Sequence, residues 1–372
     1  MPLTPPAAAP PGPPRFHPLA IAEIRRESAD AVSVRFALPD GLRAAYAYRA
    51  GQYLTLRAVL DGEEVRRTYS ICAGEDEAEL RIAIKRTEGG YFSVWAQDHL
   101  HPGRVIDVMT PTGRFGIPPA AQPGAARLHV GIAGGSGITP LLSVIRTVLA
   151  REPASRFLLL YASRASGQIL FRAELEDLKD RHLGRLAVQH ILSREQQDIA
   201  VLGGRLDAAR IRHLLAGLLA GAPVDAAYVC GPAGLLEQAE AALAALGVPA
   251  ARIHVERFTS AEQGSPRAAA APPPPPGAPA VAHAGITIHG IRSEVPIAAG
   301  EAVLDAALRA GLDLPYACKG GMCCTCRARL VSGEVEMLQN YSLEPWERDA
   351  GFVLTCQSHP RSARLELDYD QQ

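Results

Sequence analysis

The sequence predicts three domains in a row: an antiparallel β-barrel, an α/β domain with a parallel sheet, and a smaller α+β domain. The chain has 372 residues, which is more than one domain core usually organises. Residues 16–119 contain short alternating segments separated by turn residues, whereas residues 120–258 repeat a strand followed by a helix. These two patterns are typical of antiparallel and parallel sheets respectively.

Individual elements of the first two domains follow from these patterns. In the barrel, residues 31–36 and 80–85 alternate apolar and polar side chains, which predicts strands. In the α/β domain, each apolar run leads into a helical pattern. The predicted strand and helix pairs are 128–133 with 140–150, 157–162 with 171–181, and 226–230 with 233–246.

Two segments rich in alanine and proline flank these domains. Residues 1–15 are predicted to be a disordered tail. Residues 259–284 include a run of five prolines and are predicted to be an extended, semi-rigid linker. Residues 285–372 then form the third domain, which opens with a hairpin and continues with a helix at about 301–310.

Composition argues against several classes of protein. With 48% hydrophobic residues, 21% charged residues and a formal net charge of -1, there is no electrostatic argument for a nucleic acid or a membrane surface as partner. The longest apolar stretch, residues 214–224, is shorter than the roughly 20 residues of a membrane-spanning helix. The N-terminal segment lacks the apolar core of an export signal, so we expect a cytoplasmic protein.

The cysteines give the most specific signal. There are seven, an odd number that favours metal chemistry over disulfides. Cys318, Cys323, Cys326 and Cys356 have the CxxxxCxxC spacing, with a distant fourth cysteine, of a plant-type 2Fe-2S cluster. A zinc site is the alternative, but zinc sites usually show two CxxC pairs. Cys324 is left as a non-ligand because using it in place of Cys323 breaks both spacings.

Residues 285–372 therefore resemble plant-type ferredoxins. The segments 315–318 (PYAC) and 354–357 (LTCQ) are also similar to that family. The resemblance implies a β-grasp fold for this α+β domain and a 2Fe-2S cluster as its cofactor.

Three further motifs lie in the predicted barrel. Arg67-Thr68-Tyr69-Ser70 fits a strand, Gly90-Tyr91-Phe92-Ser93 opens a helix whose N-terminal N–H groups suit a phosphate, and residues 113–115 (GRF) follow. Alone, the first motif also fits an ordinary exposed strand end. Together, their order resembles the ferredoxin-NADP reductase superfamily. That resemblance implies a flavin held by Arg67, Tyr69, Ser70, Lys85, Gly90 and Ser93.

A glycine-rich turn follows the first strand of the α/β domain. Gly134, Gly135 and Gly137 precede Thr139, which we expect to cap a helix that starts at Pro140. The turn departs from the GxGxxG fingerprint and on its own also fits a simple strand-to-helix connection. The ferredoxin-NADP reductase superfamily uses this GGxGxTP form, so the resemblance implies that these residues bind a dinucleotide pyrophosphate.

Later strand ends supply the remaining candidates. Ser163 and Arg164 stand where NAD-specific sites often place an acid, and an arginine there favours NADPH, although Arg164 also fits a solvated loop. Cys230 begins a Cys-Gly-Pro turn that in the superfamily lies beside the nicotinamide; a buried structural thiol is the alternative. By the same resemblance, Phe258 is the candidate aromatic near the flavin.

These parts imply one electron path. A nicotinamide delivers two electrons as hydride and a 2Fe-2S cluster accepts one, so a flavin is needed between them. The whole architecture most resembles the reductase components of phenylacetyl-CoA epoxidases, which are multicomponent bacterial di-iron oxygenases. The resemblance implies FAD, NADPH and the oxygenase subunits as partners. Three alternatives remain. The flavin is FMN in place of FAD, the acceptor is another one such as a Rieske oxygenase or a hybrid-cluster protein, or the protein has a redox-sensing or nitric-oxide-detoxifying role.

Overall fold

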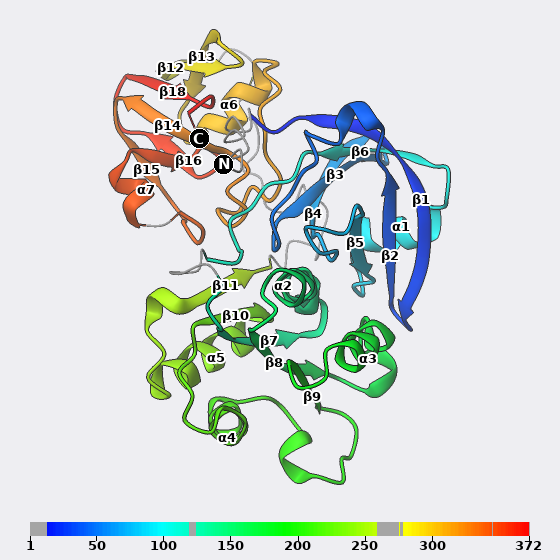
Figure 1. Cartoon of the computed structure of the whole chain (residues 1–372). Coiled ribbons are helices and arrows are strands. Elements are labelled where there is room, and N and C mark those ends of the chain that lie inside the picture. The colour runs from blue at the N-terminus through cyan, green and yellow to red at the C-terminus, as the bar shows by residue number, and fades with distance from the viewer. Residues whose placement is uncertain (1–12, 119–123, 259–274, 276–277, 344, 372) are drawn as a thin grey trace, which may run out of the picture. The chain divides into compact units, whose positions relative to one another are not determined.

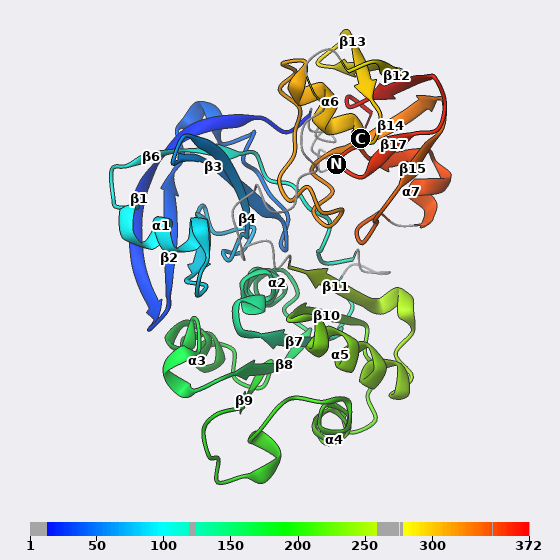
Figure 2. The ribbon, with the colours of Figure 1, turned by 180° about the vertical axis from the view of Figure 1, so that it is seen from behind.

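The computed structural model describes residues 13–118, 124–258, 275, 278–343 and 345–371 (Figures 1 and 2). The chain divides into two compact units. The barrel–nucleotide unit comprises residues 18–56 and 69–263, and the C-terminal unit comprises residues 1–17, 57–68 and 264–372. Most of the expected tail, residues 1–12, and most of the expected linker lie outside the described residues.

The first domain is built on a six-stranded sheet with the order β4-β3-β6-β1-β2-β5. Its strands are β1 (Phe16–Ser28), β2 (Ala31–Ala37), β3 (Tyr53–Leu60), β4 (Glu63–Ser70), β5 (Leu80–Lys85) and β6 (Val105–Met109), with helix α1 (Tyr91–His99). The two end strands of this order meet because Ile71, directly after β4, forms an antiparallel bridge with Ile82 of β5. This bridge closes the sheet into the antiparallel barrel that the sequence predicts.

The second domain is a five-stranded parallel sheet with the order β11-β10-β7-β8-β9. Its elements are β7 (Leu128–Gly134), α2 (Ile138–Arg151), β8 (Arg156–Ser163), α3 (Arg172–Arg181), β9 (Leu186–Leu192), α4 (Ala208–Leu219), β10 (Ala226–Gly231), α5 (Ala233–Ala245) and β11 (Ile253–Arg257). Every residue of β7 and β10 is buried, as expected for parallel strands covered on both faces. The strand order reverses between β7 and β10, and ligands of open parallel sheets bind at the carboxyl ends of the strands on either side of such a reversal.

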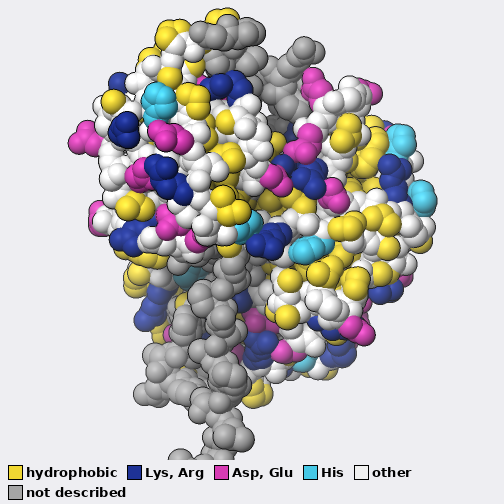
Figure 3. All heavy atoms as spheres, turned by 90° about the horizontal axis from the view of Figure 1, so that it is seen from above, with side chains coloured by type: hydrophobic (Ala, Val, Ile, Leu, Met, Phe, Trp, Pro, Cys, Tyr) yellow, Lys and Arg dark blue, Asp and Glu magenta, His cyan; other side chains and the backbone are white. Residues whose placement is uncertain are grey.

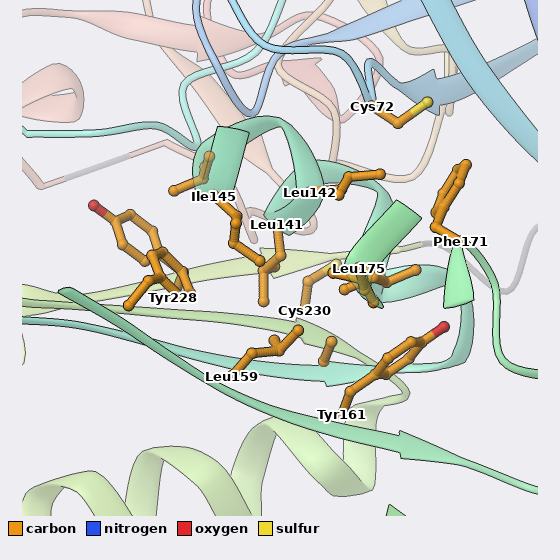
Figure 4. Close-up of a cluster of buried hydrophobic side chains, with 14 of the residues drawn as sticks. Cys72, Leu141, Leu142, Ile145, Leu159, Tyr161, Phe171, Leu175, Tyr228 and Cys230 are labelled. Carbon is orange, nitrogen blue, oxygen red and sulfur yellow. The ribbon is translucent and has the colours of Figure 1, made fainter. Parts of the chain in front are cut away.

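Helices cover both faces of the parallel sheet, as Figure 1 shows. One apolar cluster joins α4 and α5 to the sheet. The other surrounds α2, of which 11 of the 14 residues are buried. Figure 4 shows that Leu141, Leu142 and Ile145 of α2 lie between Tyr228 of the sheet and Cys72 of the barrel. Helix α2 therefore belongs to one core shared by the barrel and the nucleotide domain.

Ion pairs reinforce this shared core. Arg81 of β5 makes two hydrogen bonds to the carboxylate of Glu174 on α3, at 2.6 and 2.8 Å. Arg146 of α2 also pairs with Glu174 and donates to Glu77 at 2.5 Å. Burial raises the pKa of Glu174, but the hydrogen bonds and charges of both arginines outweigh it and lower that pKa overall. A surface pocket of about 450 Å³ beside this network is lined by these already paired side chains.

We expect Glu174→Gln to lower the free energy of unfolding by about 3 kcal/mol, because it leaves two largely buried guanidinium groups without a full counter-charge. Glu176→Gln is the matched control on the same helix. Its ion pair with Arg172 is exposed, so its loss is worth about 0.5 kcal/mol. Urea unfolding of both variants measures the difference. Equal midpoints would contradict a structural role for the network.

The C-terminal unit contains the third domain, a sheet with the order β13-β12-β18-β14-β16 and a second sheet of β15 and β17. Its elements are β12 (Ala280–Ile288), β13 (Ile291–Ala298), α6 (Val303–Arg309), β14 (Arg327–Ser332), β15 (Val335–Met337), α7 (Pro345–Asp349), β16 (Phe352–Leu354), β17 (Ser358–Pro360) and β18 (Arg364–Asp368). The predicted hairpin is β12–β13, whose turn at His289 and Gly290 has positive φ at both residues. Strand β12 begins at Ala280, inside the segment expected to be linker.

The described part of the chain contains no helix that combines the length and apolar character needed to cross a membrane. Figure 3 shows one face of the molecule, on which charged side chains of both signs are interspersed with hydrophobic ones. This mixture agrees with the balanced formal charge of the sequence.

Candidate functional site

The glycine-rich turn lies at the reversal of strand order. Gly134 ends β7, a single 3-10 turn covers Gly135–Gly137, and α2 begins at Ile138. The expectation that Thr139 caps this helix is wrong. Gly137 occupies the cap position, and the Thr139 hydroxyl lies inside the first turn, where it donates to the carbonyl of Ser136 at 2.9 Å.

Close packing requires glycine at two of these positions. A Cβ added at Gly137 would lie 2.1 Å from the carbonyl oxygen of Cys230, and one at Gly134 would lie 2.6 Å from Leu235. At Gly135, where φ is +55°, the nearest atom is the Lys85 ammonium, 3.9 Å away. The turn thus packs against the end of β10 and leaves Gly135 facing a cation, which suits an anionic pyrophosphate.

The flavin motifs converge on α1 and β4. The ring of Tyr69 lies 6.0 Å from the ring of Phe92, so the strand motif and the helix motif are in contact. Ser93 is fully buried and its hydroxyl accepts the backbone N–H of Thr87 at 3.2 Å, which fixes the turn before α1. Ser70 is buried at the end of β4.

Arg67 provides the clearest test of whether these residues fit a flavin cofactor. Its Nη1 donates to the carbonyl of Arg66 at 2.9 Å, while its Nε is buried without a hydrogen-bond partner. A buried guanidinium N–H without an acceptor is costly, and a phosphate oxygen satisfies it well. The side chains of this motif therefore fit an anionic cofactor. Lys85, the other cation of the predicted set, pairs with Asp30 at 3.4 Å.

The end of β10 carries the predicted Cys230. Its thiol is fully buried, and burial raises its pKa well above the ordinary value, so it is neutral and unsuited to act as a nucleophile. Directly opposite in the β10–β11 register stands Glu256, whose pKa burial raises to about 8. Phe258 follows β11 immediately and is 37% exposed.

Glu256 is a candidate that sequence reasoning misses. Within the segment 256–258, the resemblance to the superfamily points only to Phe258. The pairing of Glu256 with Cys230 depends on β11 lying next to β10, and the sequence alone does not give that strand order.

Two arginines mark the edge where a nucleotide ribose is expected. Arg164 follows β8 and Arg194 follows β9, and the N–H of Arg194 donates to the carbonyl of Arg164 at 2.8 Å. Both residues are exposed, while the hydroxyl of Ser163 is buried without a partner. Arg194 is absent from the predicted set, although the same Ser-Arg dipeptide ends both strands.

The four predicted cluster cysteines come together in the C-terminal unit as two pairs, Cys318 with Cys323 and Cys326 with Cys356. No group of three or more His, Cys, Asp or Glu side chains in the described residues suits a single metal ion. Two thiol pairs match the two irons of a 2Fe-2S cluster.

Backbone groups around these thiols also fit a cluster. The N–H of Gly320 points to the sulfur of Cys318 at 3.3 Å, and the N–H of Cys318 points to the sulfur of Cys323 at 3.4 Å. Such hydrogen bonds stabilise thiolate ligands. Cys324, the thiol predicted to be a non-ligand, has a positive φ of 52° and packs against the apolar core of the unit.

Comparisons with known proteins divide the chain in the same way. Family models of an oxidoreductase FAD-binding domain, an oxidoreductase NAD-binding domain and a 2Fe-2S iron-sulfur cluster binding domain match residues 18–117, 132–241 and 286–361 respectively.

Curated relatives match almost the whole chain. It is 43% identical over 358 residues to one of the subunits of the 1,2-phenylacetyl-CoA epoxidase of Escherichia coli (strain K12), covering 95% of this chain and 98% of the relative. It is 36% identical over 366 residues to the ferredoxin reductase component of 3-ketosteroid-9-alpha-monooxygenase of Mycobacterium tuberculosis (strain CDC 1551 / Oshkosh), covering 95% and 96%.

Among solved structures, phthalate dioxygenase reductase, described as a modular structure for electron transfer from pyridine nucleotides to a 2Fe-2S centre, has a TM-score of 0.55 and 25% identity. The match covers 95% of this chain and 98% of that structure. An intact type IV self-sufficient cytochrome P450 monooxygenase has a TM-score of 0.66 and 25% identity, covering 95% of this chain and 41% of that one.

Proposed function

Because the chain belongs to the family of oxygenase reductase components that join FAD-binding, NAD-binding and 2Fe-2S domains, we propose that it passes electrons from NADPH to the oxygenase subunits of a phenylacetyl-CoA epoxidase. The observation that carries this proposal is the 43% identity over nearly the full length of both chains. As an NAD(P)H-dependent oxidoreductase of this family, the protein needs an oxygenase as electron acceptor. The di-iron nature of that acceptor is part of the proposal.

The cofactors supply the redox chemistry: when bound, FAD accepts two electrons as hydride and gives them up singly to the 2Fe-2S cluster. The protein supplies binding and orientation. In this proposal Arg67, Tyr69, Ser70, Lys85, Gly90 and Ser93 hold the flavin; Gly134, Gly135, Gly137 and Thr139 hold the pyrophosphate; and Cys318, Cys323, Cys326 and Cys356 hold the cluster.

Three residues are proposed to lie at the point of hydride transfer: Cys230 and Glu256 beside the nicotinamide, and Phe258 near the flavin. Cys230 has a neutral thiol at the end of β10, buried in the apolar core around α2, and Phe258 offers an aromatic surface at the end of β11. Glu256, which pairs in register with Cys230, adds a carboxyl group that is largely protonated below about pH 8.

The preference for NADPH is supported by Arg164 and Arg194. Two exposed arginines whose backbones are hydrogen-bonded to each other can supply the positive charge that suits a 2′-phosphate, whereas an NAD-specific site usually places a carboxylate at this edge.

We expect an Arg164→Ala/Arg194→Ala double variant to raise the KM for NADPH about 100-fold, because each charge-assisted hydrogen bond contributes about 1.5 kcal/mol. The KM for NADH should stay within about twofold, since NADH has no 2′-phosphate. Arg172→Ala, an exposed arginine on α3, is the control. Steady-state ferricyanide reduction measures both constants. If the KM values for NADPH and NADH rose by the same factor, the arginines would act through the folding of the domain and not through the 2′-phosphate.

The acceptor is tested by reconstitution. Purified protein, NADPH and phenylacetyl-CoA are combined with the oxygenase component of the Escherichia coli epoxidase, and oxidation of the thioester is followed by mass spectrometry. Coupled product formation supports the proposal. Turnover only with the oxygenase component of 3-ketosteroid-9-alpha-monooxygenase, the partner named for another relative, would reassign the acceptor.

The cellular setting and the domain limits complete the proposal. We place the protein in the cytoplasm, in support of which the seven cysteines, all within the described residues, form no disulfide.

The proposed domains are residues 16–119 for FAD and 120–258 for the nucleotide, with the ferredoxin domain starting at Ala280 instead of Gly285.

A further inference from the structure

Three large apolar side chains on the C-terminal unit are exposed around the cluster-binding loops. Leu338 is 62% exposed, Tyr341 is 55% exposed and Trp346 is 61% exposed. We call these three residues the apolar rim. Each stands on a segment that is bonded to residues next to a cluster cysteine.

The segment carrying Leu338 and Tyr341 is fixed to two cysteine loops. The N–H of Leu338 donates to the carbonyl of Gln357, next to Cys356, at 3.0 Å. The N–H of Tyr341 donates at 3.0 Å to the carbonyl of Gly321, which lies inside the loop between Cys318 and Cys323. These hydrogen bonds join the backbone of Leu338 and Tyr341 to the two cysteine loops, while both side chains are exposed.

Trp346 is held by a buried ion pair. Its neighbour Glu347 is fully buried and accepts a hydrogen bond at 2.6 Å from Arg327, the residue after Cys326. Large apolar side chains that are exposed to water contribute nothing to the stability of the isolated chain. Such clusters, and exposed aromatic side chains above all, mark surfaces that bind another protein.

Charge indicates what kind of partner fits. Residues 285–372 contain 12 acidic and 8 basic residues, a formal charge of -4, whereas residues 1–284 contain 27 acidic and 30 basic residues, a formal charge of +3. Four thiolates around the cluster make the C-terminal domain more negative still. A complementary partner therefore presents an apolar surface bordered by lysine and arginine.

Tyr316, two residues before Cys318, is already in contact with other residues of the same unit. The guanidinium of Arg66 lies 3.9 Å from the ring centre of Tyr316 and 4.9 Å from that of Phe16, and it donates to the carbonyl of Leu314 at 3.4 Å. The side of the cluster loop that contains Tyr316 thus has an intramolecular contact. The apolar rim stands on different segments.

We propose that Leu338, Tyr341 and Trp346 form the docking surface for the oxygenase component, which meets them with an apolar patch bordered by basic side chains. This inference rests on the proposed function. The rim brings the partner to the loops that hold the cluster, so that an electron leaves the protein by a short path.

The test uses the full-length holoprotein and the purified oxygenase component of the Escherichia coli phenylacetyl-CoA epoxidase as probe. Tyr341→Ala and Trp346→Ala should each raise the KM for the oxygenase component about tenfold, the effect of losing an interface side chain worth about 1.4 kcal/mol. Ile291→Ala and Val331→Ala remove equally exposed apolar side chains elsewhere on the domain and should leave this KM unchanged. Anaerobic reduction of the cluster by NADPH should be unchanged in all four variants.

Each other outcome overturns the docking proposal in a recognisable way. An unchanged KM in the rim variants, with a productive wild type, removes the docking surface but leaves the proposed function standing. Slower reduction of the variants' own cluster would assign the rim to an intramolecular contact. Loss of a dimer in light scattering would assign it to a second copy. A wild type that supports no turnover with this oxygenase refutes the proposed function, and the docking proposal with it.

Discussion

A Cys323→Ser variant should lose the EPR signal of a reduced 2Fe-2S cluster. It should also reduce cytochrome c with NADPH more than about 100-fold more slowly than the wild type. Changes to residues that only contact the ligands have effects of roughly 10- to 100-fold, and loss of a direct ligand should exceed them. Reduction of ferricyanide, which accepts electrons from the flavin directly, should persist. Anaerobic titration with NADPH measures both steps: visible absorption follows reduction of the flavin, and EPR follows reduction of the cluster.

The neighbouring residue gives a matched control. Cys324→Ser changes the adjacent thiol in the same loop, and the structure packs that side chain against the core of the C-terminal unit. This variant should keep the EPR signal and the cytochrome c activity. If Cys324→Ser were the variant that lost the cluster, the ligand spacing inferred from the sequence would be wrong.

A Gly137→Ala variant should lower kcat/KM for NADPH about 100-fold, the effect of misplacing a reacting group by about 1 Å. The added Cβ would lie 2.1 Å from the carbonyl oxygen of Cys230, so the glycine turn and the end of β10 must move apart. Overpacking of this kind also costs about 1 to 3 kcal/mol of stability. Stopped-flow measurement of flavin reduction and thermal unfolding report the two effects.

Gly234→Ala is the corresponding control. Gly234 lies in α5 of the same domain, and a Cβ there meets nothing within 4 Å. Because alanine favours a helix by about 1 kcal/mol over glycine, this variant should be as active as the wild type and slightly more stable. Similar losses in both variants would show that the glycine turn is not specifically required.

Local patterns predict the regular elements well. The expected strand at 80–85 coincides with β5, and the expected strand at 157–162 differs from β8 by one residue at each end. These strands have uninterrupted apolar or alternating patterns, which depend only on near neighbours in sequence. The cluster ligands can be named for a similar reason, since three of the four lie within nine residues.

Helix α4 is absent from the predicted elements, although its signals are local. Asp207 caps it by accepting the N–H of Arg210 at 2.8 Å, and Ile211, Leu215 and Leu219 repeat at four-residue intervals on the buried face. Because residues between these positions are also apolar, the helical spacing of the buried side chains does not stand out in the sequence.

The parts of the site that sequence reasoning misses depend on the order of strands in space. Glu256 acquires its raised pKa by burial beside β10, and Arg194 joins Arg164 because β9 lies next to β8. Each residue is 26 to 30 positions from its partner in the sequence, and no local pattern connects the two positions.

The shared core around α2 also limits how the enzyme can exchange its nucleotide. Opening the barrel away from the nucleotide domain would expose the apolar side chains that α2 buries against both, together with the ion pairs of Arg81 and Arg146. The cost of such a hinge motion rises with the area uncovered. Any release of spent nucleotide that needs the barrel and the nucleotide domain to hinge apart must therefore overcome this cost in every turnover.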